Sequence, residues 1–145
     1  MLRVVGLYHG GFSPRAGRYD IAMRDDRKPL GSFGERVAAA HLEAKGYAIL
    51  DRNFRVAQAE LDLVARDGDT LVFVEVRTRR GGVVGAAASS VNARKAQQLH
   101  HAAAWYLDQH EQYADDPMRI DVVTVELRRD GTLEKVTHIQ NAVRS

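Results

Sequence analysis

The sequence contains no cysteine, and this absence removes several chemistries at once. Without a thiol the chain forms no disulfide, has no cysteine nucleophile and cannot bind zinc through sulfur. A cysteine-free composition fits a reducing compartment, so we expect a cytoplasmic protein. No apolar run approaches the ~18 residues of a membrane span, and the N-terminus lacks the hydrophobic core and cleavage site of a signal peptide. We therefore expect no membrane partner.

Several signatures of nucleotide and hydrolase chemistry are also missing. The sequence has no Walker phosphate loop, no Gly-x-Gly-x-x-Gly fingerprint and no Gly-x-Ser-x-Gly elbow. These absences argue against nucleotide hydrolysis, dinucleotide binding and serine-hydrolase chemistry. With a net charge of only +2, the overall balance does not require a nucleic-acid partner, so that argument depends on how the charges are distributed along the chain.

The length of 145 residues suits one domain with a substantial core. Residues 1–30 show no sustained periodicity, and we expect them to form a poorly ordered N-terminal arm. Basic residues outnumber acidic ones in this arm, so a nucleic-acid-binding arm is the alternative to a solvated tail. Residues 31–145 form the predicted domain.

Periodicity and turn signals predict both helices and strands. Ser32 is a good N-cap and Gly46 a good stop for the first helix, and Ser90 is the expected cap of the second. Residues 78–90, rich in Arg, Gly and Ala, predict a mobile loop. The expected elements are a helix at 32–45, a strand at 47–50 that continues or turns through 51–55, a hairpin of strands at 60–65 and 71–76, a helix at 91–109, and strands at 119–126 and 133–139. This order, α-β-β-β-α-β-β, predicts an α/β fold with one mixed central sheet flanked by helices.

Charged residues interrupt both strands of the predicted hairpin. Side chains alternate along a strand, so if Val64 pairs with Phe73, Asp62 lies opposite Glu75 with about 5 Å between the Cβ atoms. Two carboxylates this close repel each other unless a cation lies between them, and oxygen ligands suit Mg²⁺ or Mn²⁺. Arg77, on the same face as Glu75, is a permanent cation suited to phosphate.

The same residues also fit a purely structural interpretation. In that interpretation Glu75 pairs with Arg77 or Arg79, and Asp62 lies at the end of the sheet. Glu35 is similarly ambiguous, because Ser32 and Glu35 have the spacing of a capping box at a helix start. Spacing alone leaves the metal site and the charge-paired strand both open.

At this point the sequence resembles a known family. Asp62, followed on the next strand by Glu75-Val76-Arg77, resembles the PD-(D/E)xK nuclease signature. The wider pattern is similar to the uncharacterised, YraN-like bacterial family UPF0102, which is related to archaeal Holliday-junction resolvases. The matching blocks are Gly34-Glu35, Gly46-Tyr47, Arg52-Asn53-Phe54-Arg55, Glu60 to Val64, Val72 to Arg77, Lys95, Tyr106-Leu107 and Asp121-Val122-Val123.

The resemblance implies a restriction-endonuclease-like fold and metal-dependent cleavage of DNA phosphodiesters, with branched or junction DNA as a substrate. It implies that Asp62 and Glu75 bind Mg²⁺ or Mn²⁺ and that Glu35 is the helix-borne acid of the resolvase relatives. It also implies a homodimer. Two departures stand out: Ala59 replaces the usual glycine before the hairpin, and Arg77 replaces the signature lysine. Arginine stays protonated, so Arg77 cannot be a general base, but it can stabilise charge on the phosphate.

A local excess of basic residues follows the two acids. Arg77, Arg79, Arg80, Arg94 and Lys95 are the candidate contacts to backbone phosphates, and an ordinary solvated loop and helix start is the alternative. Lys95 is also a candidate to replace part of the function of the missing lysine. Trp105 and Tyr106 are expected in the core. Two functions follow from the sequence: a metal-dependent DNA endonuclease, or a nucleic-acid-binding or scaffold protein that kept the fold and lost catalysis.

Overall fold

The computed structural model describes residues 30–81 and 91–144. The elements are α1 (Leu30–Ala44), β1 (Ala48–Val56), β2 (Ala59–Asp67), β3 (Thr70–Arg80), α2 (Ala93–Gln109), a short 3-10 helix η5 (Glu111–Tyr113), β4 (Met118–Leu127) and β5 (Leu133–Val143). Their order confirms the predicted one. The predicted arm lies outside the described residues except for its last residue. No helix in the described part is long and apolar enough to cross a membrane.

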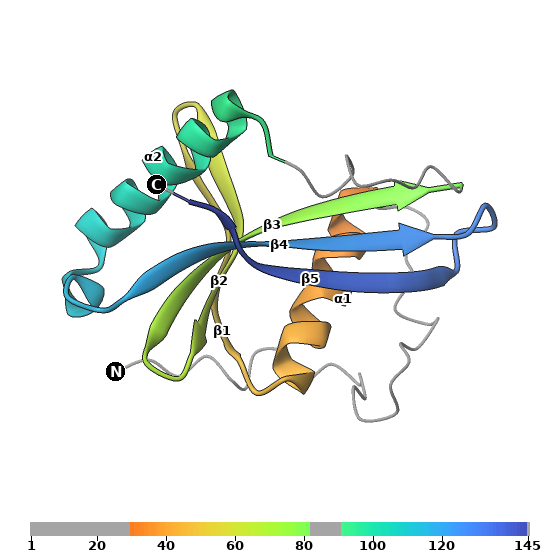
Figure 1. Ribbon diagram of the computed structural model, residues 1–145, viewed down its shortest axis with the longest axis horizontal. Helices are drawn as coiled ribbons and strands as arrows, with labels where there is room; N and C mark the ends of the chain where they lie inside the picture. The colour runs from red at the N-terminus through yellow and green to blue at the C-terminus, as the bar shows by residue number, and fades with distance from the viewer. Residues whose placement is uncertain (1–29, 82–90, 145) are drawn as a thin grey trace.

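Five strands form one mixed sheet in the order β1-β2-β3-β4-β5 (Figure 1). Neighbouring strands are antiparallel except β3 and β4, which are parallel. A parallel pair needs a crossover connection, and α2 lies in the connection between β3 and β4. The mixed sheet with flanking helices confirms the predicted fold class and is consistent with an α/β nuclease-like fold.

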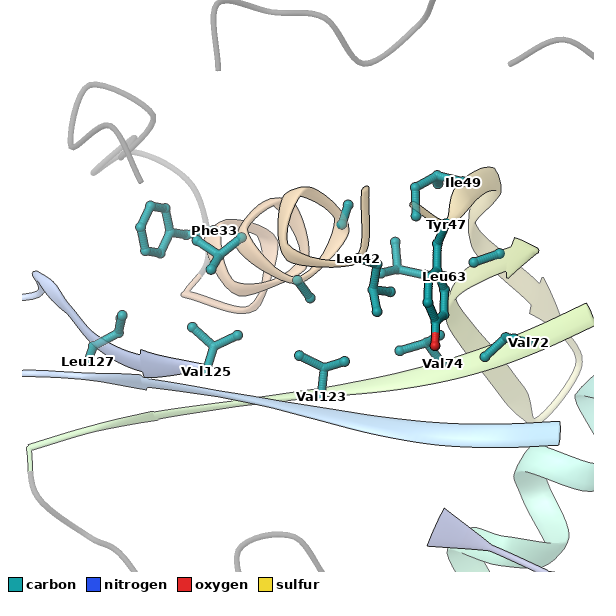
Figure 2. Close-up of a cluster of buried hydrophobic side chains, with 14 residues drawn as sticks. Phe33, Leu42, Tyr47, Ile49, Leu63, Val72, Val74, Val123, Val125 and Leu127 are labelled. Carbon is teal, nitrogen blue, oxygen red and sulfur yellow. The ribbon is translucent and has the colours of Figure 1, made fainter. Parts of the chain in front are cut away.

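Each helix buries one side of the sheet in its own apolar cluster. Figure 2 shows the first cluster, in which α1 covers the sheet: Phe33 lies above Val125 and Leu127, and Leu42 lies near Leu63 and Val74. In the second cluster, α2 residues pack on the opposite side, and the Tyr106 ring contacts the edges of Phe54 and Phe73. Because β3 is covered on both faces, its residues 71–74 are all buried and apolar.

Both helices begin at residues other than those predicted. Helix α1 starts at Leu30, so Ser32 lies within its first turn and the predicted capping box is wrong. The early start was hidden because Gly31 and Ser32 have weak helix propensity. Helix α2 is capped by Asn92, whose Oδ1 accepts the Lys95 N–H at 2.8 Å, and Ser90 lies outside the described residues.

Strand β3 is longer than the sequence predicted. Residues 78–80 were expected in a mobile loop, but they continue the parallel pairing with β4 as far as Arg80 opposite Leu127. Three arginines within four positions obscured the strand, because β-strand patterns are recognised from apolar alternation. The rest of the predicted loop, 82–90, lies outside the described residues. Because β3 is longer than predicted, Arg77 and Arg79 belong to the same strand as Glu75.

Candidate functional site

The two hairpin acids lie where β2 and β3 separate. The predicted register is confirmed, since Val64 pairs with Phe73, and the ladder ends one step further along at Leu63 and Val74. Beyond this point the β1–β2 hairpin leans toward α2, while β3 continues beside β4 and past the start of α1 (Figure 1). Asp62 and Glu75 are the first residues beyond the last pair. Both acids therefore lie outside the regular β2–β3 ladder.

Asp62 uses part of its carboxylate to hold the separated strands together. Its Oδ2 accepts the backbone N–H of Val76 at 2.7 Å. Burial raises the pKa of Asp62 to about 8; the Val76 N–H opposes this effect, and the negative charges of Glu75, Glu35 and Glu60 add to it. The charges of Glu75, Glu35 and Glu60 therefore all influence the protonation of Asp62. A cation bound among them would relieve their mutual repulsion.

Glu75 is buried and lies between two cations. Its Oε2 is 3.4 Å from Lys95 Nζ of α2 and 4.0 Å from Arg77 Nε of the same strand. Its relative exposure is 8%, and a carboxylate so buried needs such partners. The structural alternative from the sequence is therefore correct in part, because Glu75 does pair with Arg77. The contact with Lys95 adds a residue of helix α2 to the group.

A close approach between α1 and β3 brings Glu35 toward this group. A Cβ atom built on Gly34 would lie 1.9 Å from Thr78 Oγ1, so only glycine lets the helix pack this closely on the strand. Burial and the charge of Glu60 raise the pKa of Glu35, against a hydrogen bond from Asn53 and the charges of two nearby arginines. Glu35 thus faces the β1–β2 hairpin, and its charge reaches Asp62.

The predicted phosphate contacts do not all gather at the acids. Arg77 and Lys95 contact Glu75, whereas Arg80 Nε donates to the carbonyl oxygen of Arg129 in the β4–β5 connection. Arg94 is exposed at the start of α2. Arg79 Nε is buried and has no hydrogen-bond partner within the described part of the chain. The basic residues therefore spread from the carboxylates along the end of β3 and the start of α2.

The carboxylate pair fits a hard divalent cation in ligand chemistry. Within residues 30–81 and 91–144, no three His, Cys, Asp or Glu side chains gather closely enough to hold a metal ion. Mg²⁺, however, usually keeps several waters and binds one or two carboxylates together with substrate phosphates. Asp62 and Glu75 provide only oxygen ligands, which suit Mg²⁺ or Mn²⁺ rather than zinc.

A second polar cluster, on β4 and β5, was not predicted from the sequence. Asp121 is fully buried, and it accepts hydrogen bonds from Arg119, from His138 Nε2 at 2.7 Å and from the Asn141 N–H at 2.8 Å. Burial acts to raise the pKa of Asp121, but the bonds from His138, Arg119 and Asn141 outweigh it and hold the pKa below its usual value. In the sequence, the signal that could have indicated this cluster is an aspartate within an otherwise apolar strand.

The Asp121 cluster joins distant parts of the sheet. Arg119 also donates to Tyr47 Oη at 2.7 Å and pairs with Asp67, and the other ring nitrogen of His138 lies 2.8 Å from Lys45 Nζ. These bonds connect β4 and β5 to the residue before β1, the end of β2 and the residue that follows α1. All these contacts are made within the folded chain, so we assign the cluster a structural function.

The fold defines a class of protein, an α/β domain that is consistent with a nuclease-like fold, and Asp62 and Glu75 lie where its strands β2 and β3 separate. The chain belongs to the uncharacterised protein family UPF0102, whose model matches residues 34–125. A UPF0102 protein of Frankia alni is 48% identical over 122 residues, which cover 84% of this chain and 99% of the relative. Relatives from Geotalea uraniireducens and Pseudomonas aeruginosa are each 43% identical over 119 residues, covering 82% of this chain and 92% and 95% of theirs.

Among solved structures, a similar chain is SfsA of Pyrococcus furiosus, described in complex with Ca²⁺. It is 13% identical, and the match covers 92% of this chain and 71% of that one with a TM-score of 0.32. A likeness at this level carries no argument about the function of the present chain.

Proposed function

We propose that this chain is a Mg²⁺- or Mn²⁺-dependent endonuclease that cleaves DNA phosphodiesters, with branched or junction DNA as its substrate. The observation that carries the proposal is the arrangement of Asp62 and Glu75 at the point where β2 and β3 separate, with Lys95 at 3.4 Å from Glu75. Ionising both of these desolvated carboxyl groups is costly in the absence of a cation. Such a pair becomes favourable when a cation and a phosphate are bound beside it.

Each residue of the group has a separate task in this proposal. When bound, a divalent cation would polarise the scissile phosphate and lower the pKa of water. Asp62 and Glu75 would hold the cation, and Glu35 would add negative charge from α1. Because the pKa of Asp62 is raised to about 8, Asp62 must release a proton before it can serve as an anionic ligand at neutral pH.

Lys95 takes the place left by the signature lysine. Arg77 occupies that position in the chain but cannot accept a proton, so it is suited to neutralising charge on the phosphate. Lys95 reaches Glu75 from α2 instead of from β3, and its compact ammonium group can orient an attacking water or neutralise the transition state. In this proposal Arg77 on β3 and Lys95 on α2 together perform the functions that a single lysine performs in the signature.

The second candidate is a nucleic-acid-binding or scaffold protein that has lost catalysis. The observation that favours it is the pairing of Glu75 with both Lys95 and Arg77, because two cations neutralise this carboxylate without a metal. The position of Asp62, desolvated beside Glu75, Glu35 and Glu60, opposes it, because a chain that only binds DNA gains nothing from grouping these acids. The homodimer and the cytoplasmic location stay predictions; sedimentation measures the first and cell fractionation the second.

The test is cleavage of four-way-junction, flap and duplex DNA in Mn²⁺ by wild type and two matched variants. Asp62→Ala removes the proposed ligand, whereas Asp69→Asn removes an exposed acid in the β2–β3 turn. We expect nicking by wild type and Asp69→Asn and none by Asp62→Ala. Equal activity in all three chains would refute the Asp62 site, and inactivity of all three on every substrate would refute the nuclease and leave the binding protein.

A further inference from the structure

The single tryptophan of the chain lies on the surface of α2, where core packing does not explain it. Trp105 was expected in the core, but 46% of its surface is exposed, while the adjacent Tyr106 takes the buried position. Adjacent helical residues point about 100° apart, so the two aromatic side chains cannot share one face. Tryptophan is enriched among the residues that contribute most to binding interfaces.

Trp105 belongs to a stripe of exposed residues along α2. Arg94, His101 and Trp105 are spaced by seven and four residues, which places them within about 40° of one another around the helix. All three are exposed, and the His101 and Trp105 rings meet edge to face with centroids 6.3 Å apart. We call these three residues the α2 stripe. It extends about 16 Å along the helix axis.

The α2 stripe begins beside the carboxylate group. Lys95 follows Arg94 directly and contacts Glu75, so the helix leads away from the proposed cleavage site over about 15 Å to Trp105. The first turn of α2 contains no acidic residue. A nucleic-acid strand leaving the site along this helix would therefore meet a cationic start and then an exposed indole ring.

We infer that the α2 stripe binds single-stranded nucleic acid, with Arg94 on a backbone phosphate and Trp105 stacked on an unpaired base. This inference rests on the proposed nuclease function and narrows its substrate to DNA with unpaired bases close to the cut. Stacking needs an exposed base face, which a closed duplex does not offer within its stack. Aromatic stacking next to a cationic groove is the general mode by which proteins bind single strands.

The test measures binding of the full-length chain without divalent cations, so that cleavage does not interfere. Trp105 is the sole tryptophan, so intrinsic fluorescence reports directly on its stacking during titration with oligodeoxythymidine. Anisotropy of a labelled oligonucleotide then compares variants. We expect quenching by the single strand, and affinity about 5- to 150-fold weaker in Trp105→Ala, the range for loss of one stacked base. Trp105→Phe keeps an aromatic ring and should keep most of the affinity.

Met118→Ala is the matched control, because Met118 is also a large exposed apolar residue, at 37%, but lies outside the stripe. It should bind as wild type does. Equal affinity in wild type and Trp105→Ala would overturn the inference, as would an equal loss on blunt duplex. Loss of self-association in Trp105→Ala, with no quenching of wild type by DNA, would show instead that a second copy covers the ring.

Failure of this inference is distinguishable from failure of the proposed function. If Trp105→Ala binds and cleaves as wild type does while Asp62→Ala does not cleave, only the inference is wrong. If quenching and the Trp105→Ala effect are present but no chain cleaves any substrate, the stripe is supported and the nuclease is refuted.

Discussion

Replacing Asp62 by asparagine is expected to change how the stability of the chain depends on pH. The pKa of Asp62 is raised from 3.8 to about 8 in the folded chain, first by burial and then by Glu75, Glu35 and Glu60. Because the folded state holds the proton more tightly than the unfolded state, stability from this group is fully present below about pH 4. It is lost as the pH rises toward 8. The asparagine of the variant does not titrate, and its amide oxygen can still accept the Val76 N–H.

The magnitude follows from the proton linkage. Between the unfolded and folded pKa values, a single group changes the free energy of unfolding by about 1.4 kcal/mol per pH unit. From pH 5 to pH 7, wild type should therefore lose about 3 kcal/mol relative to Asp62→Asn. Titrating groups that do not interact with Asp62 are common to both chains and cancel in this difference.

Urea denaturation in metal-free buffer at a series of pH values measures the effect. We expect the two stability curves to separate steadily above pH 5, with Asp62→Asn the more stable chain at pH 7. Saturating Mg²⁺ should reduce the separation by stabilising the ionised wild type. Parallel curves throughout this range would refute the claim that Asp62 lies desolvated among other carboxylates.

Further predictions concern the supports of the site and the chemistry within it. Gly34→Ala should cost about 1–3 kcal/mol of stability through its clash with Thr78; thermal denaturation measures this, and Thr78→Ala should recover part of it. Asp121→Ala removes the buried carboxylate that Arg119, His138 and the Asn141 N–H share, and it should cost about 3–5 kcal/mol in urea denaturation, so a loss below about 1 kcal/mol would contradict the network. Lys95→Ala should slow single-turnover cleavage by about 10²- to 10³-fold. Cation affinity, measured by calorimetry, should rise by up to tenfold per pH unit below about pH 8, because binding displaces the Asp62 proton.

The hairpin was predictable because its information is local. Period-two alternation and the turn at residues 67–69 determine the register, and once Val64 pairs with Phe73 the positions of Asp62 and Glu75 follow. The order of elements was predictable for the same reason. The ends of the elements were less predictable from the sequence. Gly31 and Ser32 disfavour the helix that contains them. Arginines at positions 77, 79 and 80 obscure the end of β3, which is held by its pairing with β4.

The contacts between distant elements could not be read from the sequence. The sequence made Lys95 a candidate, but only the crossover through α2 brings it to 3.4 Å from Glu75, across twenty positions of the chain. The Asp121 cluster likewise needs the pairing of β4 with β5 to bring His138 to the carboxylate. Trp105 and Tyr106 are adjacent, and which of them is buried depends on the rotation of α2 over the sheet.

The central claim is that Asp62 and Glu75 act together as one divalent-cation site. Electron paramagnetic resonance of Mn²⁺ titrated into the protein counts bound ions directly and needs no substrate. We expect saturable binding by wild type at pH 8, at least tenfold weaker binding by Asp62→Asn and by Glu75→Gln, and unchanged binding by Asp69→Asn. Binding that is the same in all four chains would contradict the claim.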